Sequence, residues 1–175
     1  MTVDLLRLLL FPALMLFAAA SDLLTMTISN WISLLLVAGF LVLAPLTGLG
    51  AYDILLHFGA GALVLMVAFG CFAAGWIGGG DAKMVAAAAL WFGFDHLLDY
   101  LLYASLFGGS LALLMLCFRQ LPVVPYQFIG HTWLLRLHAK QTGVPYGIAL
   151  AMGALAIYPD TEWIKAVDIV RLALG

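Results

Sequence analysis

The sequence predicts an all-α, polytopic membrane protein built as a bundle of six transmembrane helices. Of its 175 residues, 66% are hydrophobic and only 9% are charged. The mean hydropathy is +1.15, which is typical of a chain whose main solvent is lipid. Apolar runs separated by Gly, Pro or charged residues recur along the chain. Because one span takes about 20 residues, we expect about six crossings and a single membrane domain over residues 1–175.

The predicted spans cover residues 5–21, 30–46, 54–77, 83–94, 97–118 and 144–159. The first resembles a signal-peptide core, but Asp4 offsets Arg7 and further membrane segments follow, so we interpret it as a retained helix. The fourth is short, because the stretch from Asp81 to Asp95 covers about 21 Å against a hydrocarbon core of roughly 30 Å.

Two further segments complete the predicted organisation. Residues 119–143 are the one long connection, and a short interfacial helix follows from Asp160. Its expected apolar side consists of Trp163, Ile164, Val167 and Val170.

Composition argues against several classes of function. A net charge of -2 and the absence of a basic stripe give no indication of nucleic-acid binding. Cys71 and Cys117 lie in apolar stretches without a CxxC partner, which favours neither a disulfide framework nor a zinc site. The four histidines, His57, His96, His131 and His138, share no metal-ligand spacing and are interpreted as packing or interfacial residues. We expect no cofactor and no metal.

Asp22 and Asp81 are the carboxylates that need an explanation, because an acidic side chain at the edge of the hydrocarbon is costly and usually functional. Asp22 follows one predicted crossing and Asp81 follows three, so both lie on the same side of the membrane and can meet. The other acidic residues fall on the opposite side. The pair is therefore a candidate catalytic dyad.

The positive-inside rule assigns this side to the cytoplasm and both termini to the outside. The aspartate side carries Lys83, Arg119, Arg136 and Lys140, whereas the other side carries Arg7, Lys165 and Arg171.

Two adjacent aspartates suit hydrolysis of a peptide bond. One carboxylate takes a proton from water while a second acid protonates the carbonyl. Like charges a few ångströms apart do not both ionise cheaply, so the pair shares one proton and titrates in two separate steps.

The residues around Asp81 have predicted supporting roles. Gly78, Gly79 and Gly80 let the backbone turn sharply and let an extended substrate approach, and free N–H groups at the helix start favour negative charge. Lys83 is expected close to Asp81.

Each residue also has a plainer interpretation. Asp22 can be a helix-end residue, and Asp81 can be the N-cap of its helix. We expect Asn30 to be the N-cap of the second span, with a role as a polar neighbour of Asp22 as the alternative.

The stretch GWIGGGDAKMVAAAALWFG, residues 75–93, resembles the core motif of the type IV prepilin peptidases, membrane aspartyl proteases of the GxGD type. Gly78-Gly79-Gly80-Asp81 supplies the GxGD, followed by Ala82-Lys83, and Asp22 with the downstream Asn30 matches the family's other aspartate. Pro145-Tyr146-Gly147 resembles the start of the family's last helix. The resemblance extends over nearly the whole chain.

This resemblance implies a bacterial inner-membrane endopeptidase with Asp22 and Asp81 as catalytic residues. Its partners would be the lipid bilayer, a pilin precursor with a basic leader and a hydrophobic helix, and possible pilus assembly machinery. The small size is similar to the short CpaA or TadV branch that serves Flp or Tad pili. Only Leu23 to Ser29 separate Asp22 from Asn30, which leaves no space for the cysteine-containing insert of larger relatives and makes N-methylation doubtful. Ile28-Ser29-Asn30 also departs from the family's Ile-Pro-Asn.

Two other functions are compatible with the residues. A small transporter or proton-relay subunit would use the aspartate pair but would need polar residues along several spans, whereas spans two, three and five are almost purely apolar, with Ser105 and Ser110 among the few exceptions. A non-enzymatic assembly subunit would bind other helices through small residues such as Gly59, Ala60 and Gly61.

Overall fold

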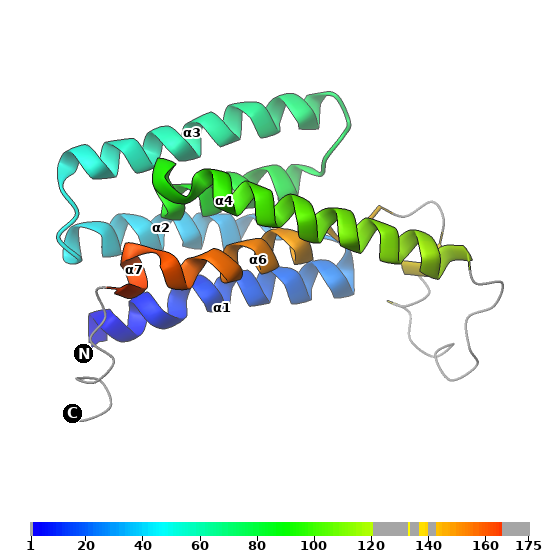
Figure 1. Cartoon of the computed structure of the whole chain (residues 1–175), viewed down its shortest axis with the longest axis horizontal. Helices are drawn as coiled ribbons and strands as arrows, with labels where there is room; N and C mark the ends of the chain where they lie inside the picture. Colours follow the sequence, from blue (N-terminus) through cyan, green and yellow to red (C-terminus); the bar gives the residue numbers. More distant parts are fainter. Residues whose placement is uncertain (1, 121–132, 134–136, 140–142, 166–175) are drawn as a thin grey trace.

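The computed structural model describes residues 2–120, 133, 137–139 and 143–165, and every regular element in that part of the chain is helical. Figure 1 shows the long helices lying roughly along one axis. The elements are α1 (Thr2–Thr25), α2 (Asn30–Leu46), α3 (Ala51–Ala73), α4 (Gly79–Gln120), α6 (Tyr146–Ile157), the 3₁₀ helix η2 (Tyr158–Asp160) and α7 (Glu162–Lys165).

Helix α4 is interrupted at Gly93, so it consists of two helical arms, residues 79–92 and 94–120. Gly93 has φ 58° and ψ -167°, a left-handed backbone that favours glycine. Figure 1 shows the ribbon of α4 reversing its direction at the end of the bundle where α3 begins. Ala86 and Ala89 of the first arm cluster with Leu97 of the second and with Ala60 of α3. The predicted boundary between spans four and five, at residues 95–96, falls two residues after this break.

The break leaves the last carbonyls of the first arm without helical partners, as at any helix end, and side chains from elsewhere bind them. His57 Nδ1 lies 2.8 Å from the Leu90 carbonyl oxygen, and since a carbonyl only accepts, this nitrogen carries the proton. The Trp163 indole N–H donates to the Trp91 carbonyl at 2.7 Å. His57 thus has a structural role at the reversal.

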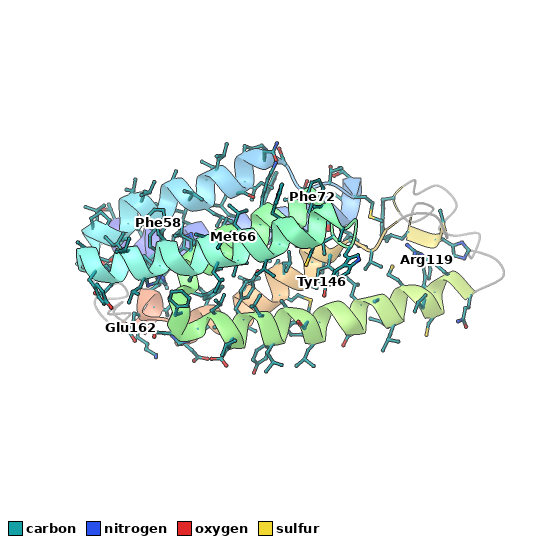
Figure 2. All side chains as sticks on the ribbon, turned by 90° about the horizontal axis from the view of Figure 1, so that it is seen from above. Phe58, Met66, Phe72, Arg119, Tyr146 and Glu162 are labelled. Carbon is teal, nitrogen blue, oxygen red and sulfur yellow. The ribbon has the colours of Figure 1, made fainter. Side chains whose placement is uncertain are left out.

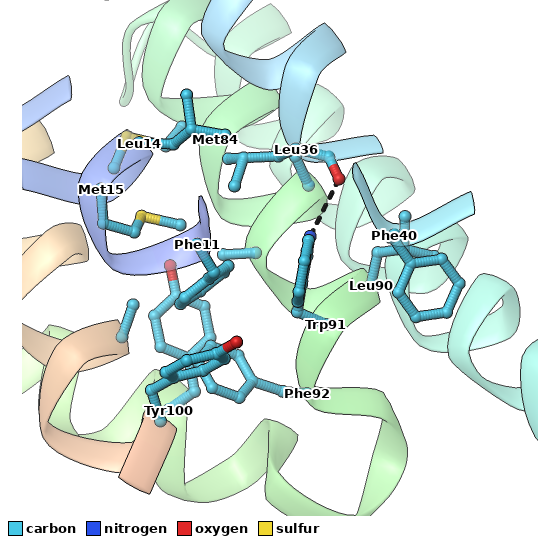
Figure 3. Close-up of a cluster of buried hydrophobic side chains, with 14 of the residues drawn as sticks. Phe11, Leu14, Met15, Leu36, Phe40, Met84, Leu90, Trp91, Phe92 and Tyr100 are labelled. Carbon is cyan, nitrogen blue, oxygen red and sulfur yellow. Dashed lines mark hydrogen bonds between the residues drawn. The ribbon is translucent and has the colours of Figure 1, made fainter. Parts of the chain in front are cut away.

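A cluster of aromatic side chains fills the end of the bundle that contains this break. We call it the aromatic end, and it consists of Phe11, Phe40, Trp91, Phe92, Tyr100, Tyr158 and Trp163, all buried. Figure 3 shows its centre, where the Trp91 indole N–H donates to the Leu36 carbonyl of α2 at 2.9 Å. The Tyr158 hydroxyl donates to the Arg7 carbonyl of α1 at 2.7 Å. These bonds join four helical segments.

Trp163 lies in a short helix, α7, but its apolar side chain faces the protein, which corrects the predicted interfacial placement. The side chain is only 4% exposed and packs at the aromatic end. The reason is the free Trp91 carbonyl, which offers the indole N–H a partner inside the protein. Residues Val167 and Val170 of that predicted helix lie outside the described residues, as does most of the 119–143 connection.

Within the described residues, three helices are long and apolar enough to cross a membrane: α1, α3 and α4. Helix α2 is apolar but shorter. Many large apolar side chains face outward, including Leu98 (78% exposed) and Met66 (68% exposed), as expected for surfaces in contact with lipid. The number of six crossings and the short fourth span stay predictions. Some predicted boundaries shift, since span three was expected to reach residue 77 and α3 ends at Ala73.

Candidate active site

Asp22 lies near the end of α1, opposite the aromatic end, and is only 5% exposed. It is thus a buried residue three positions before the helix end. Its carboxylate oxygen Oδ2 accepts a hydrogen bond of 2.8 Å from the backbone N–H of Gly147, the second residue of α6. N–H groups in the first turn of a helix have no helical partner and favour negative charge. The start of α6 therefore holds the Asp22 carboxylate from 125 residues away.

Gly147 is required at this contact. A Cβ there would lie 2.8 Å from Asp22 Oδ2, 3.1 Å from Asp22 Cβ and 2.7 Å from Ile28 Cδ1. Any side chain at this position would force the Asp22 and Ile28 side chains, or the start of α6, to move. Sequence reasoning did not identify Gly147 as the partner of Asp22, although the Pro145-Tyr146-Gly147 resemblance had marked the position.

Asp81 is the third residue of α4 and is half-buried. It is therefore not the N-cap, which corrects one of the plainer interpretations. Its carboxyl group hydrogen-bonds to the backbone of Gly78, the usual way for an acidic residue in the first turn to cap the helix start. A Cβ at Gly78 would lie 2.8 Å from Asp81 Oδ2. The absence of a side chain at Gly78 lets the carboxylate fold back to this position.

The fold brings Asp22 and Asp81 within electrostatic range of each other, since the charge of Asp22 acts on Asp81. Ile28, in the connection between α1 and α2, lies against both helix starts. A Cβ at Gly80 would be 3.1 Å from Ile28 Cβ, and one at Gly147 would be 2.7 Å from its Cδ1. The Ile28 side chain thus separates the start of α4 from the start of α6.

The three glycines before Asp81 act through close contacts rather than through a sharp turn, which corrects the predicted reason. None of them has a positive φ; the left-handed glycine in this connection is Gly75, with φ 76°. The chain itself occupies the neighbouring space, because the Phe72 ring lies against Gly79 and Ile28 lies against Gly80.

Lys83 and Asn30 bind each other instead of the aspartates. The Lys83 ammonium donates to Asn30 Oδ1 at 2.8 Å, and both side chains are exposed. The N-cap of α2 is Ser29, so the N-cap prediction for Asn30 is wrong. Because α2 begins one residue earlier than that prediction requires, the Asn30 side chain does not cap α2 and instead reaches α4. The pair joins the starts of α2 and α4.

A groove of about 510 Å³ runs between α3 and the second arm of α4, with Asp81 among its lining residues. We call it the Asp81 groove. Its other lining residues are Leu63, Val64, Val67, Ala68, Cys71, Ile77, Val85, Leu97, Leu98, Leu101, Ala104, Ser105, Tyr146 and Leu150. Apart from Asp81, its clearly polar side chains are Ser105 and Tyr146. In Figure 2 the labelled Tyr146 lies between the ribbons of α3 and this arm.

Metal-ligating residues do not gather in the part of the chain that the structure describes: no group of three or more His, Cys, Asp or Glu side chains there could hold an ion. Cys71 and Cys117 are both free thiols.

The fold and the site define a multi-pass helical membrane protein in which two carboxylates approach each other at one end of the bundle. The chain belongs to the type IV leader peptidase family, whose family model matches residues 9–113. The match includes Asp22 and Asp81 and ends before Gly147. Membership indicates a peptidase whose substrate is a prepilin. No curated protein and no solved structure matches the chain.

Proposed function

We propose that Asp22 and Asp81 are the catalytic pair of an aspartic endopeptidase that removes the leader of Flp- or Tad-type prepilins. The observation that supports this most directly is the buried Asp22 carboxylate, bound to the Gly147 N–H and in electrostatic range of Asp81. Two interacting acids that are buried or half-buried in a membrane protein are costly for stability. Membership of the type IV leader peptidase family supplies a reason to retain the pair, because two acids together can hydrolyse a peptide bond.

In this mechanism the two carboxyl groups share one proton and hold a water molecule between them. The ionised group takes a proton from the water as its oxygen attacks the scissile carbonyl carbon, and the protonated group donates its proton to the carbonyl oxygen. The Gly147 N–H orients the Asp22 carboxylate, and the Gly78 backbone orients that of Asp81. Collapse of the tetrahedral intermediate breaks the C–N bond, and the departing amine takes up a proton from the pair.

We place the reaction at the cytoplasmic face of the inner membrane, with both termini outside. The support comes from the count of basic residues in the sequence, four on the aspartate side against three on the other. Among the described residues the two ends carry two each, Lys83 and Arg119 against Arg7 and Lys165. Arg136, Lys140 and Arg171, which the sequence argument also used, are outside the described residues.

The proton-relay alternative predicts polar side chains along several spans. Beyond Asp81, Ser105 and Tyr146, the Asp81 groove is lined by apolar side chains and Cys71, a lining that suits an apolar substrate segment better than an ion path.

The test is cleavage of a tagged prepilin by membranes containing the full chain. Asp22→Asn and Asp81→Asn should each lower the cleavage rate about a thousandfold or more, since each removes a group that transfers a proton. Asp99→Asn is the matched control, because Asp99 is exposed on α4 away from the pair and its loss should leave the rate unchanged. Near-normal cleavage by an inserted Asp22→Asn or Asp81→Asn protein would refute the dyad.

A further inference from the structure

We infer that the Asp81 groove is the docking site for the first turns of the prepilin's hydrophobic helix, immediately after the scissile bond. This inference rests on the proposed function and adds a binding surface to the catalytic pair. Its starting point is that Asp81 itself lines the groove, so that the groove leads directly from a reacting group into the membrane-embedded part of the bundle.

The groove has one polar end and one apolar end. Asp81, Tyr146 and Ser105 lie at the end near the catalytic pair, while Leu97 and Leu98 lie toward the reversal at Gly93. Leu97 to Ser105 span about 12 Å at a helical rise of 1.5 Å per residue. That length matches about eight helical residues of a ligand.

The groove is open to the side, where a membrane-embedded helix would enter. Leu98 is 78% exposed and Val67 is 62% exposed, and they stand on the two helices that border it. A bound helix satisfies its own backbone hydrogen bonds, so an almost purely apolar surface is sufficient to receive it in lipid. An extended peptide would find too few polar partners along this surface.

A second apolar groove, of about 430 Å³, is a poorer candidate for the same helix. Lys83 and Asn30 line it, and its lining residues include neither aspartate. A helix seated there would bring its basic leader toward the Lys83 ammonium. In the Asp81 groove, by contrast, the leader end meets a carboxylate, which is the complementary charge.

Ser105 and Ser110 provide a matched pair of variants. Both are exposed on the second arm of α4, and both hydroxyls donate to the carbonyl four residues earlier, at 2.7 Å and 2.8 Å. Ser105 lines the Asp81 groove and Ser110 does not. Ser105→Trp fills the groove and should lower kcat/KM for prepilin about tenfold or more, whereas Ser110→Trp should stay within about twofold of the unmodified protein.

The two native cysteines allow a binding test that does not depend on cleavage. Cys71 lines the groove, Cys117 does not, and both are free. In an Asp22→Asn background, a prepilin with one cysteine in the first two turns of its helix should form an oxidative cross-link with the enzyme. Cys71→Ser should abolish this cross-link, and Cys117→Ser should leave it intact.

The outcomes separate the groove from the proposed function. If prepilin is cleaved, but Ser105→Trp behaves like Ser110→Trp and no Cys71 cross-link forms, the groove assignment is overturned and a lipid tail is the better occupant. A Cys71 cross-link without cleavage by the unmodified enzyme would support the groove and refute the proposed function.

Discussion

The two ends of the bundle are built from different side chains, so we expect substitutions at the two ends to have different effects. At the aromatic end, large rings fill the space between helices, and indole and hydroxyl donors bind backbone carbonyls across them. At the aspartate end, glycines allow close approach, an aliphatic residue separates two helix starts, and a carboxylate is buried. We therefore expect the aromatic end to contribute most of the packing stability, whereas two interacting acids at the other end lower the stability of the fold.

Replacement of Trp91 by alanine should have the largest effect. Trp91 is fully buried and packs against Phe11 and Trp163 with ring centroids 5.1 Å and 4.8 Å apart. The substitution leaves a cavity and removes the indole hydrogen bond to the Leu36 carbonyl, so we expect a loss of about 3 kcal/mol or more. Unfolding in detergent, followed by near-UV circular dichroism, measures it.

Trp76→Ala is the control for this prediction, because Trp76 is 79% exposed on the connection after α3. Equal destabilisation by the two substitutions would contradict the assignment of stability to the aromatic end.

Gly147→Ala should have the next largest effect, and on activity rather than on stability. The new methyl group meets Asp22 Oδ2 and Ile28 Cδ1 at 2.8 Å and 2.7 Å, so the carboxylate must move from its N–H donor. We expect kcat to fall about a hundredfold, equivalent to about 2.7 kcal/mol of transition-state stabilisation. A prepilin cleavage assay with a parallel melting curve distinguishes the two effects.

Gly109→Ala is the matched control, since a Cβ at Gly109 has no neighbour within 4 Å. A Gly147→Ala enzyme with unchanged kcat would show that the Gly147 N–H does not position Asp22.

Trp163→Phe isolates one hydrogen bond of the aromatic end. Phenylalanine keeps most of the ring packing but removes the N–H that binds the Trp91 carbonyl at 2.7 Å. A buried carbonyl left without a donor costs about 1 to 2 kcal/mol. Chemical denaturation should detect this loss while prepilin cleavage stays normal; a fall in kcat at full stability would mean that the two ends are coupled.

Lys83→Met should have the smallest effect. It removes the 2.8 Å bond to Asn30, but both side chains are exposed, and such bonds contribute about 1 kcal/mol or less. We expect cleavage within about threefold of normal, because the bond joins helix starts and contacts neither aspartate. Asn30→Ala should reproduce the same change, and a much larger loss for Lys83→Met alone would assign the lysine a direct role at the site.

The local sequence was sufficient to predict an all-helical fold with long apolar helices and to single out Asp22 and Asp81 as candidates, because each inference depends on composition within a short window. Long apolar runs indicate membrane helices wherever they occur, and a carboxylate at their edge is costly whatever surrounds it. The same reasoning placed the boundary after the fourth segment within two residues of Gly93.

What surrounds the aspartates was decided by tertiary structure. Gly147 binds Asp22 across 125 residues, Lys83 turns to Asn30 across 53 residues, and Trp163 is buried against a carbonyl that the break at Gly93 sets free. Each depends on which helix ends meet in space. Local apolar patterns do not specify which helix ends become neighbours, since the free N–H and carbonyl groups at helix ends bind whichever partner the packing brings to them.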